Sequence, residues 1–189
     1  MHHAQMLKHL RALSIGVLLP AAAAAGAKPV CYDSARYHVI AQDLDDGPGQ
    51  RIAVLARKPG DATPACSAAQ AKALPALAVP EESYAVGLKQ DFLLLDQGTG
   101  PDGRELLLWD LRSARVAWRS AYDELLHEQR ADALVFWRPE KKAADEAGCP
   151  QLRQWRKESL GAVMEQQVRL TLADLSVSPL GRWRCVAQQ

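Results

Sequence analysis

Four cysteines are the residues with the clearest chemistry in this chain, and their spacing favours disulfides over metal or redox sites. Cys31, Cys66, Cys149 and Cys185 form an even set, and no pair has the Cys-x-x-Cys spacing of a zinc knuckle or a thioredoxin-type site. Four cysteines allow three pairings. We favour Cys31 with Cys66 and Cys149 with Cys185, because each loop then closes within one end of the chain. Each bridge should stabilise the fold by roughly 3 kcal/mol, chiefly by restricting the unfolded chain.

The signatures of common hydrolases are incomplete. His127-Glu128 begins like the helix of a zinc protease, but Ala131 stands where the second histidine is needed. No Gly-x-Ser-x-Gly elbow, Ser-x-x-Lys pair or phosphate-binding loop occurs in the sequence. We therefore assign no catalytic, cofactor-binding or metal-binding residues, and we expect no cofactor.

A glycine-rich segment matches a nucleotide-binding pattern in its letters only. Gly98, Gly100 and Gly103 have the spacing of a dinucleotide-binding loop. That loop must open a helix whose amino end holds a pyrophosphate, whereas residues 106–109 are apolar and predict a strand. We interpret residues 96–103 as a hairpin loop.

Carboxylates leave one catalytic alternative open. A hydrolase acting on an envelope polymer needs two carboxyl groups about 5 to 10 Å apart, a separation that is spatial and not sequential. The available residues are Glu81, Glu82, Glu105, Asp110 and Glu128. In most proteins such residues are solvated surface groups.

The first 27 residues predict a secretory signal peptide. Lys8 and Arg11 precede an apolar run at residues 13–19, and alanines follow up to Ala27, after which we expect cleavage. The apolar run is too short to span a bilayer. Cleavage leaves residues 28–189 as one disulfide-stapled domain, which we expect to be periplasmic or secreted and not inserted in the membrane.

The charge balance argues against nucleic acid and anionic membranes as partners. The chain has 23 Lys and Arg against 22 Asp and Glu, and two of the bases lie in the predicted signal segment, so the mature net charge is −1. A basic field, which nucleic acid binding requires, is missing from this composition.

The amino-terminal half predicts a hairpin, a short helix and two strands. Residues 37–44 and 51–57 are rich in β-forming side chains and flank a loop of turn formers, residues 45–50. Ser67-Ala-Ala-Gln70 has the form of a capping box, and Pro75 stops the helix that follows. Tyr84, Val86 and Leu88 should share one face of a strand, and the apolar run at 92–95 should be a central strand.

Residues 105–119 have a recognisable pattern: Glu-Leu-Leu-Leu-Trp-Asp, a short polar turn, then Arg-Val-Ala-Trp-Arg. The segment resembles one blade hairpin of a WD40 or quinoprotein-type β-propeller, in which a strand ending in Trp-Asp returns through a turn to an aromatic residue. The pattern occurs once, whereas a closed propeller needs at least about four blades. The resemblance therefore implies a hairpin here and nothing further.

The carboxyl-terminal half predicts two more strands, a helix and a turn. Residues 133–138 should form a strand, and residues 123–130 a helical turn. Pro150 should start a helix that Gly161 ends. Val168, Leu170 and Leu172 alternate with polar residues, as in a half-buried strand, and residues 178–181 suit a type I turn.

Together these segments predict a mostly β fold, with α+β as the alternative: an antiparallel sheet, sandwich or open meander of about seven to nine strands with two short helices. Of five tryptophans, we expect at most one or two to be exposed. We expect a non-catalytic envelope protein that binds another envelope protein through an exposed apolar or aromatic patch. The alternatives are the carboxylate-dependent hydrolase and a glycan or small-ligand binder.

Overall fold

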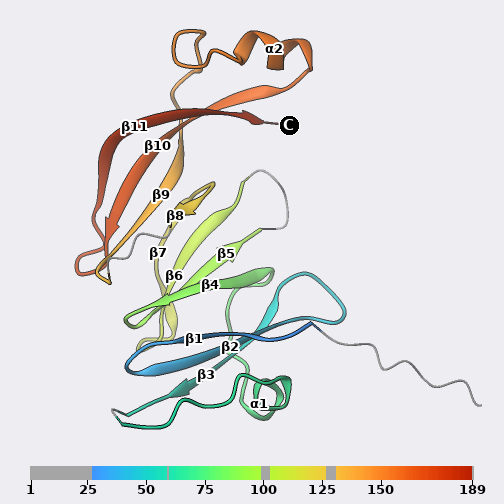
Figure 1. Ribbon diagram of the computed structural model, residues 1–189, viewed down its shortest axis with the longest axis vertical. Coiled ribbons are helices and arrows are strands. Elements are labelled where there is room, and N and C mark those ends of the chain that lie inside the picture. Colours follow the sequence, from blue (N-terminus) through green and yellow to red (C-terminus); the bar gives the residue numbers. More distant parts are fainter. Residues whose placement is uncertain (1–26, 59, 99–102, 127–130, 189) are drawn as a thin grey trace, which may run out of the picture.

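The computed structural model describes residues 27–58, 60–98, 103–126 and 131–188. This part of the chain forms three antiparallel sheets with two short helices and two disulfides, which confirms the predicted fold class. The sheets are stacked in chain order along the long axis of the molecule, and the described strands do not close into a barrel (Figure 1). Residues 1–26 of the predicted signal segment lie outside the described residues.

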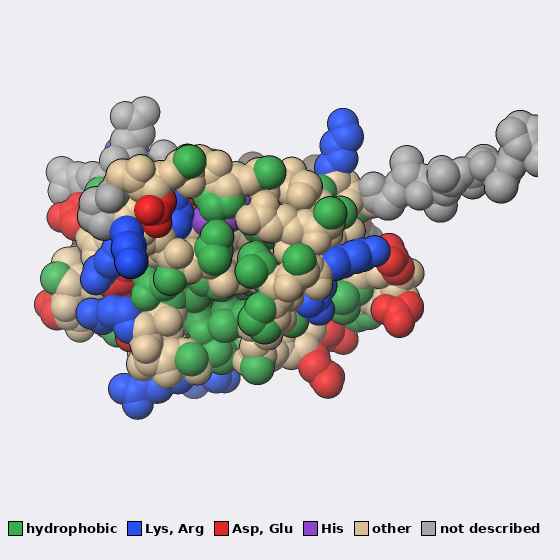
Figure 2. All heavy atoms as spheres, turned by 90° about the horizontal axis from the view of Figure 1, so that it is seen from below, with side chains coloured by type: hydrophobic (Ala, Val, Ile, Leu, Met, Phe, Trp, Pro, Cys, Tyr) green, Lys and Arg blue, Asp and Glu red, His purple; other side chains and the backbone are tan. Residues whose placement is uncertain are grey.

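The first sheet contains the predicted hairpin and carries helix α1. Its strands are β1 (Val30–Asp33), β2 (Tyr37–Asp43) and β3 (Gln50–Ala56), and α1 (Ala68–Ala73) contacts β2 and β3. The hydroxyl of Ser67 accepts a hydrogen bond from the amide of Gln70 at 3.2 Å, which is the cap that the sequence predicts. On the face seen from the α1 end, apolar side chains gather at the centre and charged ones at the rim (Figure 2).

The middle sheet is a four-stranded meander, and the third sheet follows the same plan. The middle strands are β4 (Ser83–Lys89), β5 (Phe92–Gln97), β6 (Glu105–Asp110) and β7 (Arg115–Ala121). The third sheet has β8 (Leu125–Leu126), β9 (Ala133–Glu140), β10 (Gly161–Thr171) and β11 (Val177–Gln188), with α2 (Leu152–Lys157) between β9 and β10. The hairpin suggested by the propeller resemblance is β6–β7, and the central strand predicted at 92–95 is β5.

The middle sheet buries both of its faces. Leu93, Leu95 and Leu107 pack against the first sheet, in what we call the first core. Leu94 and Leu108 point the other way and pack against the third sheet, in the second core. This is why β5 and β6 read as nearly continuous apolar runs, since neither face of these strands meets water.

The predicted alternation of Tyr84, Val86 and Leu88 is wrong at a bulge in the middle sheet, and a second bulge lies in β7. The register of β4 against β5 shifts between Ala85 and Gly87, so Val86 packs on the second core while Leu88 packs on the first. A similar shift in β6–β7 sends Val116 to the first core and Trp118 to the second. A bulge adds one residue and reverses the alternation beyond it, which a strict period of two cannot anticipate.

The carboxyl-terminal half differs from the prediction in three places. Residues 178–181 lie inside β11 and not in a turn: Pro179 and Gly181 (φ 74°) coincide with a register shift on this edge strand, where proline is tolerated. The chain reverses earlier, where the amide of Thr171 bonds to the carbonyl of Ser176. Helix α2 ends at Lys157, so Gly161 starts β10 instead of ending the helix.

The strand count and the turn at 123–130 also differ. The described residues form eleven strands, more than expected, because short strands such as β1 and β8 carry too few residues for a periodic signal. Leu125 and Leu126 pair with β9, where a helical turn was predicted, and residues 127–130 lie outside the described residues.

The disulfides have the predicted pairing. Cys31 bonds to Cys66 and Cys149 to Cys185. The second bridge joins β11 to the start of the α2 segment, and Cys149, Leu152 and Met164 form a small apolar cluster beside it. One tryptophan of the five, Trp183, is exposed at 41%, in agreement with the expectation of one or two.

The shared middle sheet predicts that both cores unfold together. Leu107→Ala, in the first core, and Leu108→Ala, in the second, should each lower the free energy of unfolding by about 3 kcal/mol, because both side chains are fully buried. Urea titration followed by tryptophan fluorescence and by circular dichroism should give one coincident transition for each variant. Leu44→Ala, at a side chain exposed by 43%, should change stability by less than about 0.5 kcal/mol. Separate transitions for the two halves would contradict this coupling.

Candidate functional site

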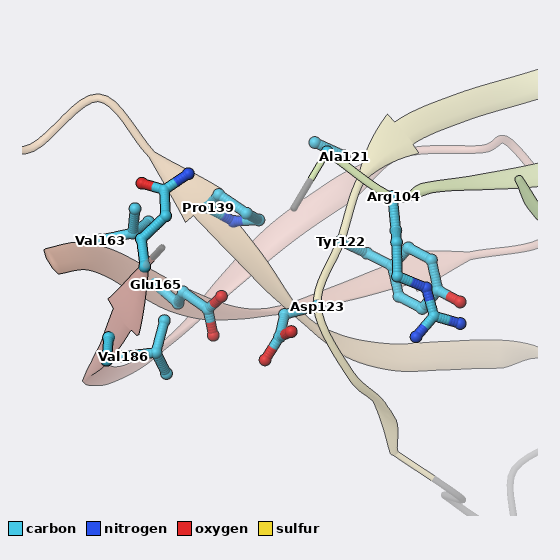
Figure 3. Close-up of a pocket in the computed structure, with 11 residues that line it drawn as sticks. Arg104, Ala121, Tyr122, Asp123, Pro139, Val163, Glu165 and Val186 are labelled. Atoms are coloured by element: carbon cyan, nitrogen blue, oxygen red, sulfur yellow. The ribbon is translucent and has the colours of Figure 1, made fainter. Parts of the chain in front are cut away.

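A cavity of about 390 Å³ opens between the middle and third sheets, and we call it the inter-sheet cavity. One wall comes from the ends of β6 and β7 and the segment that leaves β7; the other comes from β9, β10 and β11 (Figure 3). Its lining residues are Gly103, Arg104, Ala121, Tyr122, Asp123, Pro139, Val163, Glu165, Val186, Ala187 and Gln188. The volume falls in the range of small-molecule sites.

An ion-pair cluster centred on Arg184 borders this cavity. The guanidinium donates from Nε to Glu165 at 2.7 Å and from a terminal nitrogen to Glu124 at 2.6 Å, and it also pairs with Asp123. It lies over the Trp137 ring, 4.6 Å from the ring centroid. Arg184 and Glu165 are opposite each other in the β10–β11 pair, so the register of the sheet itself brings them together.

Glu165 is the most buried member of the cluster. Its side chain is 2% exposed, whereas those of Asp123 and Glu124 are 45% and 53% exposed. Burial raises the pKa of Glu165 above its usual range, and the nearby Asp123 and Glu124 carboxylates raise it further, while Arg184 opposes the shift.

Arg104 and Tyr122 form the other charged side of the cavity. Arg104 donates from Nε to Asp96 at 3.0 Å and makes a second bond to the same carboxylate, so its charge is matched by a buried partner. The guanidinium lies 5.7 Å from the centroid of the Tyr122 ring. Burial raises the pKa of the Tyr122 hydroxyl above its usual range.

Among the described carboxylates that the sequence offered as a catalytic pair, Glu105 and Asp110 lie at opposite ends of β6 and have different partners. Glu105 lies 3.9 Å from Arg119, and Asp110 accepts hydrogen bonds from the Arg112 amide and the Ser113 hydroxyl. Glu81 and Glu82 are exposed in the turn before β4, and Glu128 lies outside the described residues, as does His127.

The structure instead places Asp123 and Glu165 in one cavity, and sequence reasoning missed both. They are 42 positions apart and belong to no motif. The one sequence signal for burial of Glu165 is the apolar run that precedes it, Ala162–Met164. The alternation of polar and apolar residues in the same strand, however, predicts that Glu165 faces solvent. Arg184 bonds to both carboxylates through different nitrogens, so both are held in ion pairs with one guanidinium.

His38 belongs to a second polar cluster, at the edge of the first sheet. It is 1% exposed, and its Nδ1 lies 2.9 Å from Asp33, which also accepts from Arg57 at 3.0 Å. The other ring nitrogen, Nε2, has no hydrogen-bond partner in the described chain. No nucleophile is therefore bonded to this histidine, and the cluster connects β1, β2 and the end of β3.

The outer edge of β11 is the longest free strand edge of the third sheet. β11 pairs with β10 on one side only, and its residues Trp183–Gln188 run opposite Gln166–Gly161 in regular register. Within the described chain, no backbone bond from any segment other than β10 reaches these six residues, which we call the β11 edge. Trp183 is exposed at its start, with the Lys142 ammonium 4.7 Å from its ring centroid.

Comparison with protein-family models, curated protein sequences and solved structures finds no match for this chain. Within the described ranges, no group of three or more His, Cys, Asp or Glu side chains is arranged to hold a metal ion. Neither of the two helices in these ranges has the length and apolar content to cross a membrane.

The raised pKa of Glu165 predicts a distinctive pH dependence of stability. The folded protein holds this proton more tightly than the unfolded chain, so its contribution is complete below the ordinary carboxyl pKa and is lost as pH rises through the raised value. Compared with Glu165→Gln, the native protein should therefore lose stability in urea titrations as pH rises above the ordinary carboxyl pKa.

Glu146 is the matched control, because it also pairs with an arginine, Arg153, but at the surface. Hydrogen bonding to Arg153 lowers the pKa of Glu146. Any stability advantage of the native protein over Glu146→Gln should therefore diminish as pH falls, which is opposite to the pH dependence expected for Glu165. If the native protein instead became more stable relative to Glu165→Gln as pH rises, the ion pair with Arg184 would outweigh burial in setting the pKa of Glu165, contrary to our expectation.

Proposed function

We propose that this chain is an exported, non-catalytic protein that binds an extended segment of another exported protein along the β11 edge. The observation that carries the proposal is a free strand edge of six residues in regular register, flanked by an exposed tryptophan. Unpaired amide and carbonyl groups along a strand edge are a template for an added strand, and most proteins block such edges with charge, proline or a covering element.

The features that would prevent an added strand from pairing with β11 are confined to its first half. Pro179 and the register shift disrupt the strand before Trp183, while Trp183–Gln188 contains neither proline nor glycine. A partner segment would add to this second half, and the Trp183 ring would cover part of it. Tryptophan is enriched at the centres of protein interfaces because it combines a large apolar area with few rotatable bonds.

The charge near Trp183 favours an acidic partner segment. Lys141, Lys142 and Arg182 are all exposed, and none of them has a carboxylate partner among the described residues. Three unmatched cations beside a free strand edge would attract a segment carrying Asp or Glu and would disfavour a basic one.

The compartment supports this proposal. Two disulfides indicate an oxidising environment, and the predicted signal peptide would deliver the chain to the periplasm or the medium. After expression in a bacterial host, the intact mass of the exported protein should correspond to residues 28–189 with both disulfides closed. A retained leader or free thiols in the exported fraction would contradict the assignment.

The binding proposal is tested by site-specific crosslinking. A photo-crosslinking amino acid at Ala187, on the β11 edge, should capture one exported partner in near-equal amount, and Trp183→Ala should lower the yield at least about tenfold. The same amino acid at Ala117, an exposed position on β7, is the matched control and should capture nothing above background.

Leu44→Ala separates the β11 edge from other apolar surface. Leu44 is 43% exposed, close to the 41% of Trp183, but lies in the loop after β2. It should leave the crosslink unchanged. Equal loss of the crosslink in Leu44→Ala and Trp183→Ala, or capture of a partner from Ala117 as well as from Ala187, would contradict binding at the β11 edge. The hydrolase and the glycan binder would then be the remaining alternatives.

A further inference from the structure

The inter-sheet cavity has an excess of negative charge. Arg104 is matched by Asp96, so the remaining charged residues that line the cavity are Glu165 and Asp123, both members of the Arg184 cluster. That cluster sets one guanidinium against three carboxylates, Glu165, Asp123 and Glu124. Since a single arginine cannot neutralise three carboxylates, a cation entering the cavity would be attracted.

Two carboxylate oxygens at this cavity remain available. Arg184 bonds to Oε2 of Glu165 and to Oδ2 of Asp123, whereas Glu165 Oε1 and Asp123 Oδ1 accept no hydrogen bond from the described residues. The two side chains point toward one another across the cavity (Figure 3). A buried carboxylate with an unused acceptor oxygen is a strong site for a charged donor.

The rest of the wall is apolar or aromatic. Pro139, Val163 and Val186 lie on the third-sheet side, and the ring of Tyr122 lies on the other. A ligand that suits both parts has one charged donor group and a short apolar body. An ammonium group offers three donors and no acceptor, which fits carboxylate oxygens, whereas a carboxylate ligand would be repelled by them.

We propose that the inter-sheet cavity is a binding site for a small organic cation, a protonated primary amine with a short aliphatic tail. The ammonium group donates to Glu165 Oε1 and Asp123 Oδ1, and the tail packs against Val163, Val186 and Pro139. This site shares the residues Val186, Ala187 and Gln188 with the β11 edge, but Trp183 does not line it.

Three probes with four carbon atoms each test the charge requirement: n-butylamine, 1-butanol and butyrate. In ¹H–¹⁵N NMR titrations of the mature protein, n-butylamine should shift the amides of Glu165, Asp123 and Val186, with a dissociation constant of about millimolar, as expected for five heavy atoms. 1-Butanol should bind at least about tenfold more weakly, and butyrate should not bind.

Glu165→Gln should weaken n-butylamine binding about tenfold or more, because the charged acceptor is lost. Glu146→Gln removes a carboxylate that also pairs with an arginine but lies outside the cavity, and it should leave the affinity unchanged. If Glu165→Gln fails to fold, Asp123→Asn, at an exposed side chain, provides the same test with a similar expected loss.

Val163→Phe should fill the cavity and abolish binding of amine and alcohol alike, which identifies the tail site. Equal affinity for n-butylamine and 1-butanol, preference for butyrate, or wild-type affinity in both carboxylate variants would overturn the proposal. Trp183→Ala should not change amine binding, so failure of the partner proposal and failure of the amine site can be told apart.

Discussion

The burial of both faces of the middle sheet is the constraint on which the rest of the structure depends. Leu93 and Leu94 are neighbours in β5, yet each is almost fully buried, one in the first core and one in the second. The first and third sheets therefore need no contact with each other, because each packs against the same four strands. Side-chain packing on one face of the middle sheet fixes the positions of its strands, and the side chains on the other face must pack with the strands in those positions.

Hydrogen bonds at the ends of the middle sheet reinforce this arrangement. Tyr32 of β1 donates to the carbonyl of Ala85 at 2.8 Å, and Gln50 of β3 accepts from the Ala85 amide at 2.8 Å. At the β4–β5 turn, the buried carboxylate of Asp91 pairs with Arg36 from the first sheet and lies 3.5 Å from Arg112 in the β6–β7 turn. These bonds hold the first sheet in register with the second where packing alone would allow sliding.

Sequence patterns predicted where strands and helices lie along the chain better than they predicted which face of a sheet each side chain occupies. The hairpin β2–β3, the capped helix α1 and strand β5 followed from turn formers, a capping residue and an apolar run, all of which are local signals. The bulges in β4 and β7 could not be predicted this way, because a bulge is stabilised by the two packed faces and not by its own residues. Pro179 is a further case in which a local signal is misleading. Proline is typical of turns, but Pro179 lies in β11, an edge strand in which proline is tolerated.

The disulfide pairing was predictable because the two loops are local, with partners 35 and 36 positions apart. The candidate site was not. Asp123 lies in the segment between β7 and β8 and Glu165 lies in β10, and their proximity depends on the third sheet packing against the end of β7, which no spacing in the sequence records. Only the register of β10 and β11, which sets Glu165 opposite Arg184, has a local origin.

Arg184 is the residue that connects the two proposed surfaces. Its side chain holds three carboxylates at the cavity, while its backbone belongs to the β11 edge next to Trp183. An ammonium ion at Glu165 Oε1 and Asp123 Oδ1 would share these carboxylates with Arg184, whereas an added strand would restrain the Arg184 backbone. The cavity cluster and the β11 edge thus meet in one residue, Arg184, which the register of the β10–β11 pair places opposite Glu165.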